Sequence, residues 1–444
     1  HRDLHTAYRR QRQMCIRDRF MVDLDSFRSK ILPLRERARI MNDWLRVRLD
    51  RVLPEIMVRE GFDMWLVIAR EYNEDPVMMS LLPEPMMSAR RRTILMFYLK
   101  KDGGLERLVL SRYGLKDFYT AAWDPEKEEQ YACLTRLVKE RDPESIGINV
   151  SKTFAFGDGL SHGEYLQLSD ALGSEYLSRT RGAERLAVGW LERRIKGEID
   201  AYPGIVEIAH AIIREAFSNR VIHPGVTTTD DVVWWMRQTI LDLGLETWFQ
   251  PSVSIQALDQ PVPALGKTPK KVRKLILPGD LLHCDMGIRY LGLCTDTQHN
   301  AYVLKLGESD APAGLKDALK TANRLQEILI DEFVVGRTGN QILASALGKA
   351  RAEGINASIY THPLGYHGHA AGPTIGLWDR QDGVPGRGDY KLFDDTCYSI
   401  ELNIRMDVPE WNGQEVRMAL EDDAVFTGGR VYWLAGPQKN LYLI

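Results

Sequence analysis

Several features that mark secreted, membrane-spanning or nucleic-acid-binding proteins are missing from this sequence. Its five cysteines are an odd number without a Cys-x-x-Cys pair, which argues against a disulfide framework. No apolar run approaches the roughly 18 to 20 residues that cross a bilayer, and no leader resembles a secretory signal. The formal net charge of -3 supplies no field that would attract nucleic acid or an anionic membrane. We therefore expect a peptide or small molecule as the partner and the cytoplasm as the compartment.

The length allows two or three domains, because 444 residues with 44% apolar composition can bury several cores. Residues 1–20 are basic and lack a period that could bury one face, so we expect a non-native leader outside the fold. Residues 21–185 alternate helical and strand-like segments, such as the amphipathic stretch 38–60 and the apolar run 64–69. This alternation predicts an N-terminal α/β domain, followed by a second domain over residues 186–444.

The second domain contains a pattern of paired helices that occurs twice. Apolar residues at helical spacing precede the break His223-Pro224-Gly225, and a further helix is predicted over residues 230–243. A comparable pair surrounds the break at residues 335–339, with its second helix predicted over 341–352. Strand-rich sequence accompanies each pair. The order predicts a duplicated α+β half-unit.

A pair of aspartates flanks the first predicted hairpin of this domain. Residues 281–304 indicate two strands around a turn near Tyr290-Leu291-Gly292. The midpoint between Asp285 and Asp296 falls at this turn, so a two-residue turn would make the two aspartates direct cross-strand partners. Their carboxylates would repel each other. A bound divalent cation is the simplest species that could lie between them.

A pair of glutamates flanks a second hairpin of the same construction. Asn412-Gly413 is a hairpin-turn signal between strand-like runs, and the midpoint of Glu401 and Glu421 falls beside it, at Trp411. Most acidic residues are solvated, and any one of these acids taken alone would be assigned to solvent. Two hairpins with symmetrically placed acids in apolar strands favour metal or arginine partners, because burying unpaired carboxylates is costly.

Histidines are available to complete such a site. The glycine-rich stretch 361–379 contains His362, His367 and His369, and glycine lets the backbone approach a site closely. A single histidine is more often a packed or surface residue. Three of them beside four acids favour a metal site, because imidazole and carboxylate are common ligands of divalent cations.

At these residues the sequence resembles the pita-bread metallopeptidases, which include methionine aminopeptidase, Xaa-Pro aminopeptidase, prolidase and the metal-free creatinase. The similarity covers residues 190–430. The gap between Asp285 and Asp296 matches the aspartate spacing of that family. The segments at 399–401 and 421–425 resemble its two glutamate strands.

The histidine segment carries the rest of the resemblance. His362-Pro363-Leu364-Gly365 is similar to the family's ligand motif, and His369 falls where the family has a substrate-facing histidine. The resemblance implies that five residues bind two divalent metal ions: Asp285, Asp296, His362, Glu401 and Glu421. Oxygen-rich ligation with one imidazole suits manganese, cobalt, iron or zinc.

The resemblance also implies a fold and an activity. The fold would be α+β: a C-terminal pita-bread fold, in which duplicated α+β half-units surround an antiparallel sheet, with a smaller creatinase-like N-terminal α/β domain. The activity would be that of a dinuclear peptidase of the aminopeptidase P or prolidase type, which hydrolyses an N-terminal peptide bond and frequently forms homodimers. Glu401 is the expected general base, and His369 is expected to stabilise the tetrahedral intermediate or to orient the carbonyl.

Three departures from the family pattern concern the substrate. No histidine lies between His223 and His283, upstream of the first aspartate, where these peptidases carry one. Ser358 stands where Xaa-Pro-cleaving members have histidine, and Gln298-His299 replaces Thr-Arg after the second aspartate. The departures support a rival hypothesis, a pita-bread protein that hydrolyses a small-molecule amide or binds peptide or protein without turnover. The complete ligand set favours the peptidase.

The segment Gly159-Leu160-Ser161-His162-Gly163 also fits the nucleophile elbow of serine hydrolases. That motif needs a preceding buried strand, and Gly157-Asp158 is poor strand sequence. Ser161 and Glu164 instead predict a capping box at the start of a helix.

Overall fold

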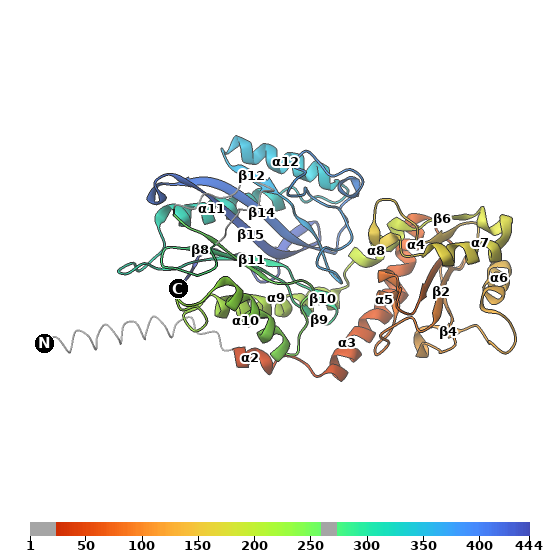
Figure 1. The fold of residues 1–444 in the computed structure, drawn as a ribbon. Helices are drawn as coiled ribbons and strands as arrows, with labels where there is room; N and C mark the ends of the chain where they lie inside the picture. Colours follow the sequence, from red (N-terminus) through yellow and green to blue (C-terminus); the bar gives the residue numbers. More distant parts are fainter. Residues whose placement is uncertain (1–23, 259–272) are drawn as a thin grey trace.

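The computed structural model describes residues 24–258 and 273–444 (Figure 1). The leader expected at residues 1–20 lies outside the described residues. Two large sheets are present, one within residues 64–182 and one within residues 252–443, and helices accompany both. Among the helices of the described segments, none combines the length and the apolar character needed to cross a bilayer.

The first sheet has six strands in the order β4-β3-β2-β1-β5-β6. β1 to β3 form an antiparallel meander, and β4, β5 and β6 pair in parallel with their neighbours. The apolar run at 64–69 forms β1, as predicted. The strands are β1 (Met64–Arg70), β2 (Arg92–Leu99), β3 (Leu105–Leu110), β4 (Thr120–Ala121), β5 (Ile146–Ile148) and β6 (Thr180–Gly182).

Helices cover both faces of this sheet, which explains the continuous apolar sequence of β1. Trp65 and Val67 point into a core shared with α3, α4, α5 and α8. Leu66 and Ile68 point to the other face, into a core shared with α6 and α7. The helices are α2 (Leu24–Arg28), α3 (Leu34–Val47), α4 (Leu53–Glu60), α5 (Pro76–Leu81), α6 (Gln130–Arg141), α7 (His162–Leu177) and α8 (Glu184–Glu192), with a π-helical turn η2 (Arg48–Val52) between α3 and α4.

The segment with the serine-hydrolase pattern forms a helix cap. The Ser161 hydroxyl accepts a hydrogen bond from the backbone N–H of Glu164 and caps α7. The Glu164 side chain does not return the second bond of a capping box, because its Oε2 accepts from the Tyr131 hydroxyl at 2.7 Å. A 3-10 turn, η4 (Ala155–Gly157), stands where an elbow would need a strand. The predicted helix start at Ser161 is confirmed, but the Glu164 side chain does not form the second hydrogen bond of a capping box. The nucleophile elbow is excluded.

The second sheet has nine strands, six of them in the order β12-β14-β15-β11-β8-β7. β13 pairs with β14, β16 with β15 and β17 with β11, and only the last of these pairings is parallel. A two-stranded ribbon, β9 and β10, extends the β8–β11 hairpin. The strands are β7 (Ser252–Gln256), β8 (Leu281–Met286), β9 (Arg289–Tyr290), β10 (Leu293–Cys294), β11 (Thr297–Tyr302), β12 (Asn356–Ile359), β13 (His362–Leu364), β14 (Thr396–Val408), β15 (Gln414–Thr427), β16 (Arg430–Trp433) and β17 (Tyr442–Leu443).

Two pairs of helices pack on this sheet (Figure 1). α9 contacts β8 and β11, and α11 contacts β14 and β15. In both pairs a glycine with positive φ precedes a threonine that caps the second helix: Gly225 before Thr228, and Gly336 before Thr338. The helices are α9 (Lys196–Ala216), α10 (Thr229–Asp242), α11 (Ala313–Ile330) and α12 (Gly339–Ala352). The repeat agrees with the predicted α+β half-units.

The two faces of this sheet differ in polarity. Ile400 and Leu420 pack into the core beneath α11. Glu401 and Glu421 follow them directly in β14 and β15, so the pleat directs the glutamates to the opposite face. The predicted metal ligands of these strands therefore lie on the face away from the helices.

The register of the second hairpin is as predicted. Glu401 lies directly opposite Glu421 in the β14–β15 ladder. Asn412 and Gly413 both have positive φ at the turn, the conformation that this dipeptide favours.

The register of the first hairpin differs from the prediction. Asp285 lies opposite Gln298 and not opposite Asp296. The turn residues with positive φ are Leu291 and Gly292, and β9 pairs with β10 around them. The direct pairing of Asp285 with Asp296 is therefore wrong. Asp296 precedes Gln298 by two positions, so the two aspartates are diagonal neighbours on one face of the sheet.

Candidate metal centre

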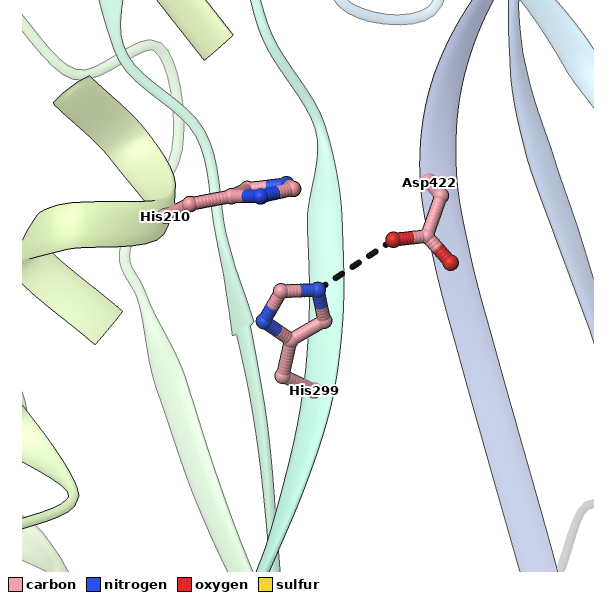
Figure 2. Close-up of side chains that lie close together, drawn as sticks. All are labelled: His210, His299 and Asp422. Atoms are coloured by element: carbon pink, nitrogen blue, oxygen red, sulfur yellow. Dashed lines mark hydrogen bonds and ion pairs between the residues drawn. The ribbon is translucent and has the colours of Figure 1, made fainter. Parts of the chain in front are cut away.

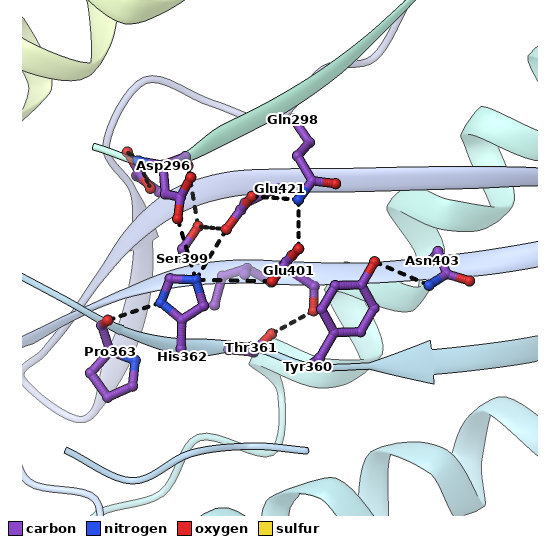
Figure 3. Close-up of polar contacts among 12 residues, drawn as sticks. Asp296, Gln298, Tyr360, Thr361, His362, Pro363, Ser399, Glu401, Asn403 and Glu421 are labelled. Carbon is purple, nitrogen blue, oxygen red and sulfur yellow. Dashed lines mark hydrogen bonds and ion pairs between the residues drawn. The ribbon is translucent and has the colours of Figure 1, made fainter. Parts of the chain in front are cut away.

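Five predicted ligands converge on the face of the second sheet that lies away from the helices, and Figure 3 shows most of them. β15 runs between β14 and β11, so Glu421 occupies a central place. Each ligand comes from a different part of the sheet: Asp285 from β8, Asp296 from the residue before β11, His362 from β13, Glu401 from β14 and Glu421 from β15.

Asp285, Asp296 and Glu421 form a first group of candidate ligands. One carboxylate oxygen from each lies within 4.8 Å of the other two. Asp296 and Glu421 are buried, at 3% and 1% exposure. Oδ1 of Asp285 is buried and has no hydrogen-bond partner within the described part of the chain. Oxygen donors this close together, one of them unpartnered, fit a divalent cation.

His362, Glu401 and Glu421 form a second group, so Glu421 belongs to both. Nε2 of His362 lies 3.2 Å from Oε1 of Glu421 and 3.9 Å from Oε2 of Glu401. Its Nδ1 lies 3.0 Å from the carbonyl oxygen of Pro363, which can only accept a hydrogen bond. Nδ1 therefore carries a proton, and when His362 is neutral its Nε2 lone pair faces the carboxylates.

The buried carboxylates of this centre repel one another, and bound cations would offset that repulsion. Burial, and then the charge of Glu421, raise the pKa of Asp285 to about 8. The same two causes raise the pKa values of Asp296 and Glu401 well above the ordinary range. Nε2 of His362 lies 3.5 Å from a carboxylate oxygen of Asp296, 3.9 Å from one of Glu401 and 3.2 Å from one of Glu421. Four carboxylates and one imidazole thus fit divalent cations both in ligand type and in charge.

Neutral side chains hold the two glutamates in place. Nε2 of Gln298 donates to Oε1 of Glu401 at 2.5 Å and to Oε2 of Glu421 at 2.7 Å. The Ser399 hydroxyl donates to Oε1 of Glu421 at 2.7 Å. His283 Nε2 lies 2.9 Å from the Gln298 amide oxygen and donates to it, which fixes the orientation of the amide. Gln298 donates to the glutamate oxygens that do not face His362. It therefore orients the two carboxylates and leaves the oxygens that face His362 available to a cation.

The sequence of the domain matches a known family. The model of metallopeptidase family M24 matches residues 204–428, just over half of the chain. The chain belongs to metallopeptidase family M24. A search of curated protein sequences gives no significant match.

Solved structures resemble this M24 protein over most of its length. The X-Pro aminopeptidase of Thermotoga maritima has a TM-score of 0.63 at 17% identity, over 88% of this chain and 100% of that one. The Xaa-Pro dipeptidase of Bacillus anthracis has a TM-score of 0.61 at 16% identity, over 92% and 100%. The prolidase of Pyrococcus furiosus has a TM-score of 0.56 at 14% identity, over 87% and 99%. These likenesses confirm the predicted pita-bread fold.

The three histidines of the glycine-rich stretch have different surroundings in this M24 protein. His369 is exposed, and its ring centroid lies 4.7 Å from that of His362. Trp248 packs against His369 at 5.2 Å. A nitrogen of His369 also lies close to ligand atoms of Asp296 and His362. His367 instead packs on Phe156, with ring centroids 4.6 Å apart. The structure therefore brings two of the three histidines to the centre.

The departures from the family pattern lie around the centre. β7 places Ser252 opposite Asp285, so a hydroxyl stands beside the first aspartate on this strand. Ser358 lies opposite Asn403 in the β12–β14 ladder. The Asn403 amide donates to the Tyr360 hydroxyl at 3.1 Å. A hydroxyl group thus stands at position 358, where the family resemblance implied an imidazole.

The sequence interpretation missed the residues that support the ligands. Gln298 was noted only as a departure, and Ser399 and His283 were given no role. The signal was available, because each stands two positions along extended chain from a predicted ligand and therefore on the same face of the sheet.

Proposed function

We propose that this M24 protein is a dinuclear metal-dependent aminopeptidase that hydrolyses the N-terminal bond of short peptides, with a preference for proline in second place. The observation that carries the proposal is the pair of three-ligand groups that share Glu421. A carboxylate common to two groups suits a centre with two cations. Manganese, cobalt, zinc and iron all suit this ligand set.

Glu401 is the side chain best placed to move a proton. When bound, the cations would supply an acidified water molecule and polarise the scissile carbonyl. The Glu401 side chain is 15% exposed and that of Glu421 is 2% exposed, so Glu401 is the more accessible to water and substrate. Gln298 donates to Oε1 of Glu401 and does not engage Oε2, which faces His362 at 3.9 Å. Glu401 would take a proton from the water and pass it to the leaving amine.

His369→Ala should slow peptide hydrolysis without removing metal. His369 is exposed beside the buried candidate ligand His362, so it can reach a bound substrate. We expect kcat/KM to fall by about 10² to 10³-fold, as for the loss of one group that stabilises developing charge. Metal content should equal that of wild type. His367→Ala, a matched change in the same loop, should keep the wild-type rate. Loss of metal in His369→Ala would show instead that His369 is a metal ligand.

The charge of the centre bears on the substrate. Four ionised carboxylates offset the full charge of two divalent cations, so a free α-ammonium group can bind near the acids. N-acetylation removes that positive charge and should prevent productive binding. Proline preference rests on the likeness to proteins described as X-Pro aminopeptidase and Xaa-Pro dipeptidase.

A peptide panel tests the proposed specificity. Xaa-Pro, Xaa-Ala and Met-Ala peptides, each free and N-acetylated, would be assayed with manganese, cobalt and zinc. We expect the free Xaa-Pro peptides to be cut fastest, with release of the N-terminal residue. Faster cleavage of acetylated or internal bonds would refute the aminopeptidase and leave a metallohydrolase. Absence of turnover in protein with bound metal would favour the small-molecule amidohydrolase or the binding protein.

A further inference from the structure

A second polar cluster lies on the helix-covered face of the same sheet (Figure 2). It consists of His210 from α9, His299 from β11 and Asp422 from β15, which are 5%, 2% and 1% exposed. Asp422 directly follows Glu421, so the pleat points the two acids to opposite faces. The sheet therefore separates this cluster from the candidate metal centre.

One nitrogen of this cluster, Nε2 of His210, has no hydrogen-bond partner in the described part of the chain. Ala209 and Ile213 of α9 belong to the apolar core beside His210, and the positive charge of Arg214, one turn along the helix, also acts on His210. Nε2 of His210 is buried and has no partner among residues 24–258 and 273–444. Figure 2 shows the His210 side chain extending from α9 toward His299 and Asp422. Leaving a buried polar atom unpartnered is costly, so an unpartnered nitrogen aimed at two other polar groups indicates a ligand-binding position.

The donor atoms of the cluster suit a transition metal. One nitrogen from each histidine and one carboxylate oxygen all lie within 4.8 Å of one another. Nε2 of His299 lies 3.2 Å from Oδ1 of Asp422. Two imidazoles and a carboxylate are a donor set found in zinc sites.

Other side chains orient these donors from outside. The Tyr442 hydroxyl lies 3.1 Å from Nδ1 of His299, which leaves Nε2 to face the cluster. The Gln326 amide donates to Oδ2 of Asp422 at 2.9 Å, which leaves Oδ1 to face His299. Metal ligands in proteins are commonly held by such outer hydrogen bonds.

We propose that His210, His299 and Asp422 bind one transition-metal ion of the zinc class at a structural site. The ion would join α9 to β11 and β15, within the core and away from the substrate. Such an ion stabilises the folded state because the unfolded chain does not hold the three ligands together. Closed zinc sites usually have four protein ligands, so three predict weaker binding.

Metal analysis of the full-length protein tests this site. His210→Phe removes the ring nitrogens, keeps an aromatic ring and leaves the His299–Asp422 contact in place. After zinc loading, wild type should hold about three ions per chain and His210→Phe about two. Zinc should raise the melting temperature of wild type more than that of the variant. Peptide hydrolysis should be unchanged. His223→Phe, the same change at an exposed histidine, should bind zinc like wild type.

Anomalous diffraction from zinc-loaded wild-type crystals gives a readout that needs no variant. A zinc peak among the three side chains is expected. Equal zinc content in wild type and His210→Phe would overturn the proposal. So would an anomalous map without a zinc peak at the cluster, because His299 and Asp422 would then form an ordinary ion pair. If the peptidase centre itself binds no ion, wild type should hold about one ion and His210→Phe none. The two proposals can therefore fail separately.

Discussion

Glu421→Ala is expected to lose both divalent cations of the peptidase centre and, with them, peptide hydrolysis. Glu421 belongs to both ligand groups and is almost fully buried. The cations are expected to supply several kcal/mol of transition-state stabilisation, so kcat should fall by about 10³-fold or more. Elemental analysis and peptide hydrolysis, with chelated wild type as the reference, measure both effects.

The melting temperature separates loss of metal from loss of fold in this variant. Chelation should lower the melting temperature of wild type, because cations bound only by the folded state stabilise it. The melting temperature of Glu421→Ala should no longer respond to a chelator that acts on this centre. Glu415→Ala makes the same change on the same strand, at a half-exposed residue that pairs with Arg405. It should keep wild-type metal content. Unchanged metal content in Glu421→Ala would remove Glu421 from the ligand set.

The two hairpins show how far strand patterns can place a site. The second hairpin was predictable because its turn signal, Asn412-Gly413, fixes the register that puts Glu401 opposite Glu421. The first hairpin lacks such a signal, and the turn lies one residue later than predicted. A one-residue shift of the turn moves each cross-strand partner by two positions, which keeps every side chain on its face. Asp285 and Asp296 therefore still meet, as diagonal neighbours.

Contacts between distant segments could not be predicted in this way. The cluster of His210, His299 and Asp422 joins three elements whose positions depend on how the helices pack on the sheet. The hydrophobic periodicity of each segment does not indicate how the helices pack on the sheet. The N-terminal α/β character followed from alternation of helical and strand-like segments, but the strand order, with β1 between β2 and β5, depends on tertiary pairing.

A buried ion cluster links the N-terminal helical segment to the loop between His362 and His369. Glu198 of α9 and Arg48 of η2 are both fully buried, with Nη1 of Arg48 3.1 Å from Oε2 of Glu198. Arg194 approaches the other carboxylate oxygen at 3.6 Å. Tyr366, in the loop, donates its hydroxyl to that oxygen at 2.6 Å. Glu198 is thus the common partner of three side chains from three segments.

Glu198→Gln is expected to lower the free energy of unfolding by about 3 to 5 kcal/mol, the usual cost of removing one member of a buried ion pair. The loss is large because Arg48 and Arg194 are fully buried and would keep their charges without the carboxylate. Urea denaturation near neutral pH measures it. Glu207→Gln is the matched control, since Glu207 lies exposed on the same helix, and it should change stability by less than about 0.5 kcal/mol.

The pH dependence of this loss tests whether charge is its cause. Burial alone would raise the pKa of Glu198, but the guanidinium groups of Arg194 and Arg48 hold it below its ordinary value of 4.5. A carboxyl whose pKa is lowered by folding contributes stability above its unfolded pKa and loses that contribution as pH falls through the folded pKa. The stability difference between wild type and Glu198→Gln should therefore be constant above pH 4.5 and shrink below it. A difference that stays the same in acid would assign the loss to packing and hydrogen bonding, and a loss no larger than that of Glu207→Gln would show that the ion cluster does not stabilise the fold.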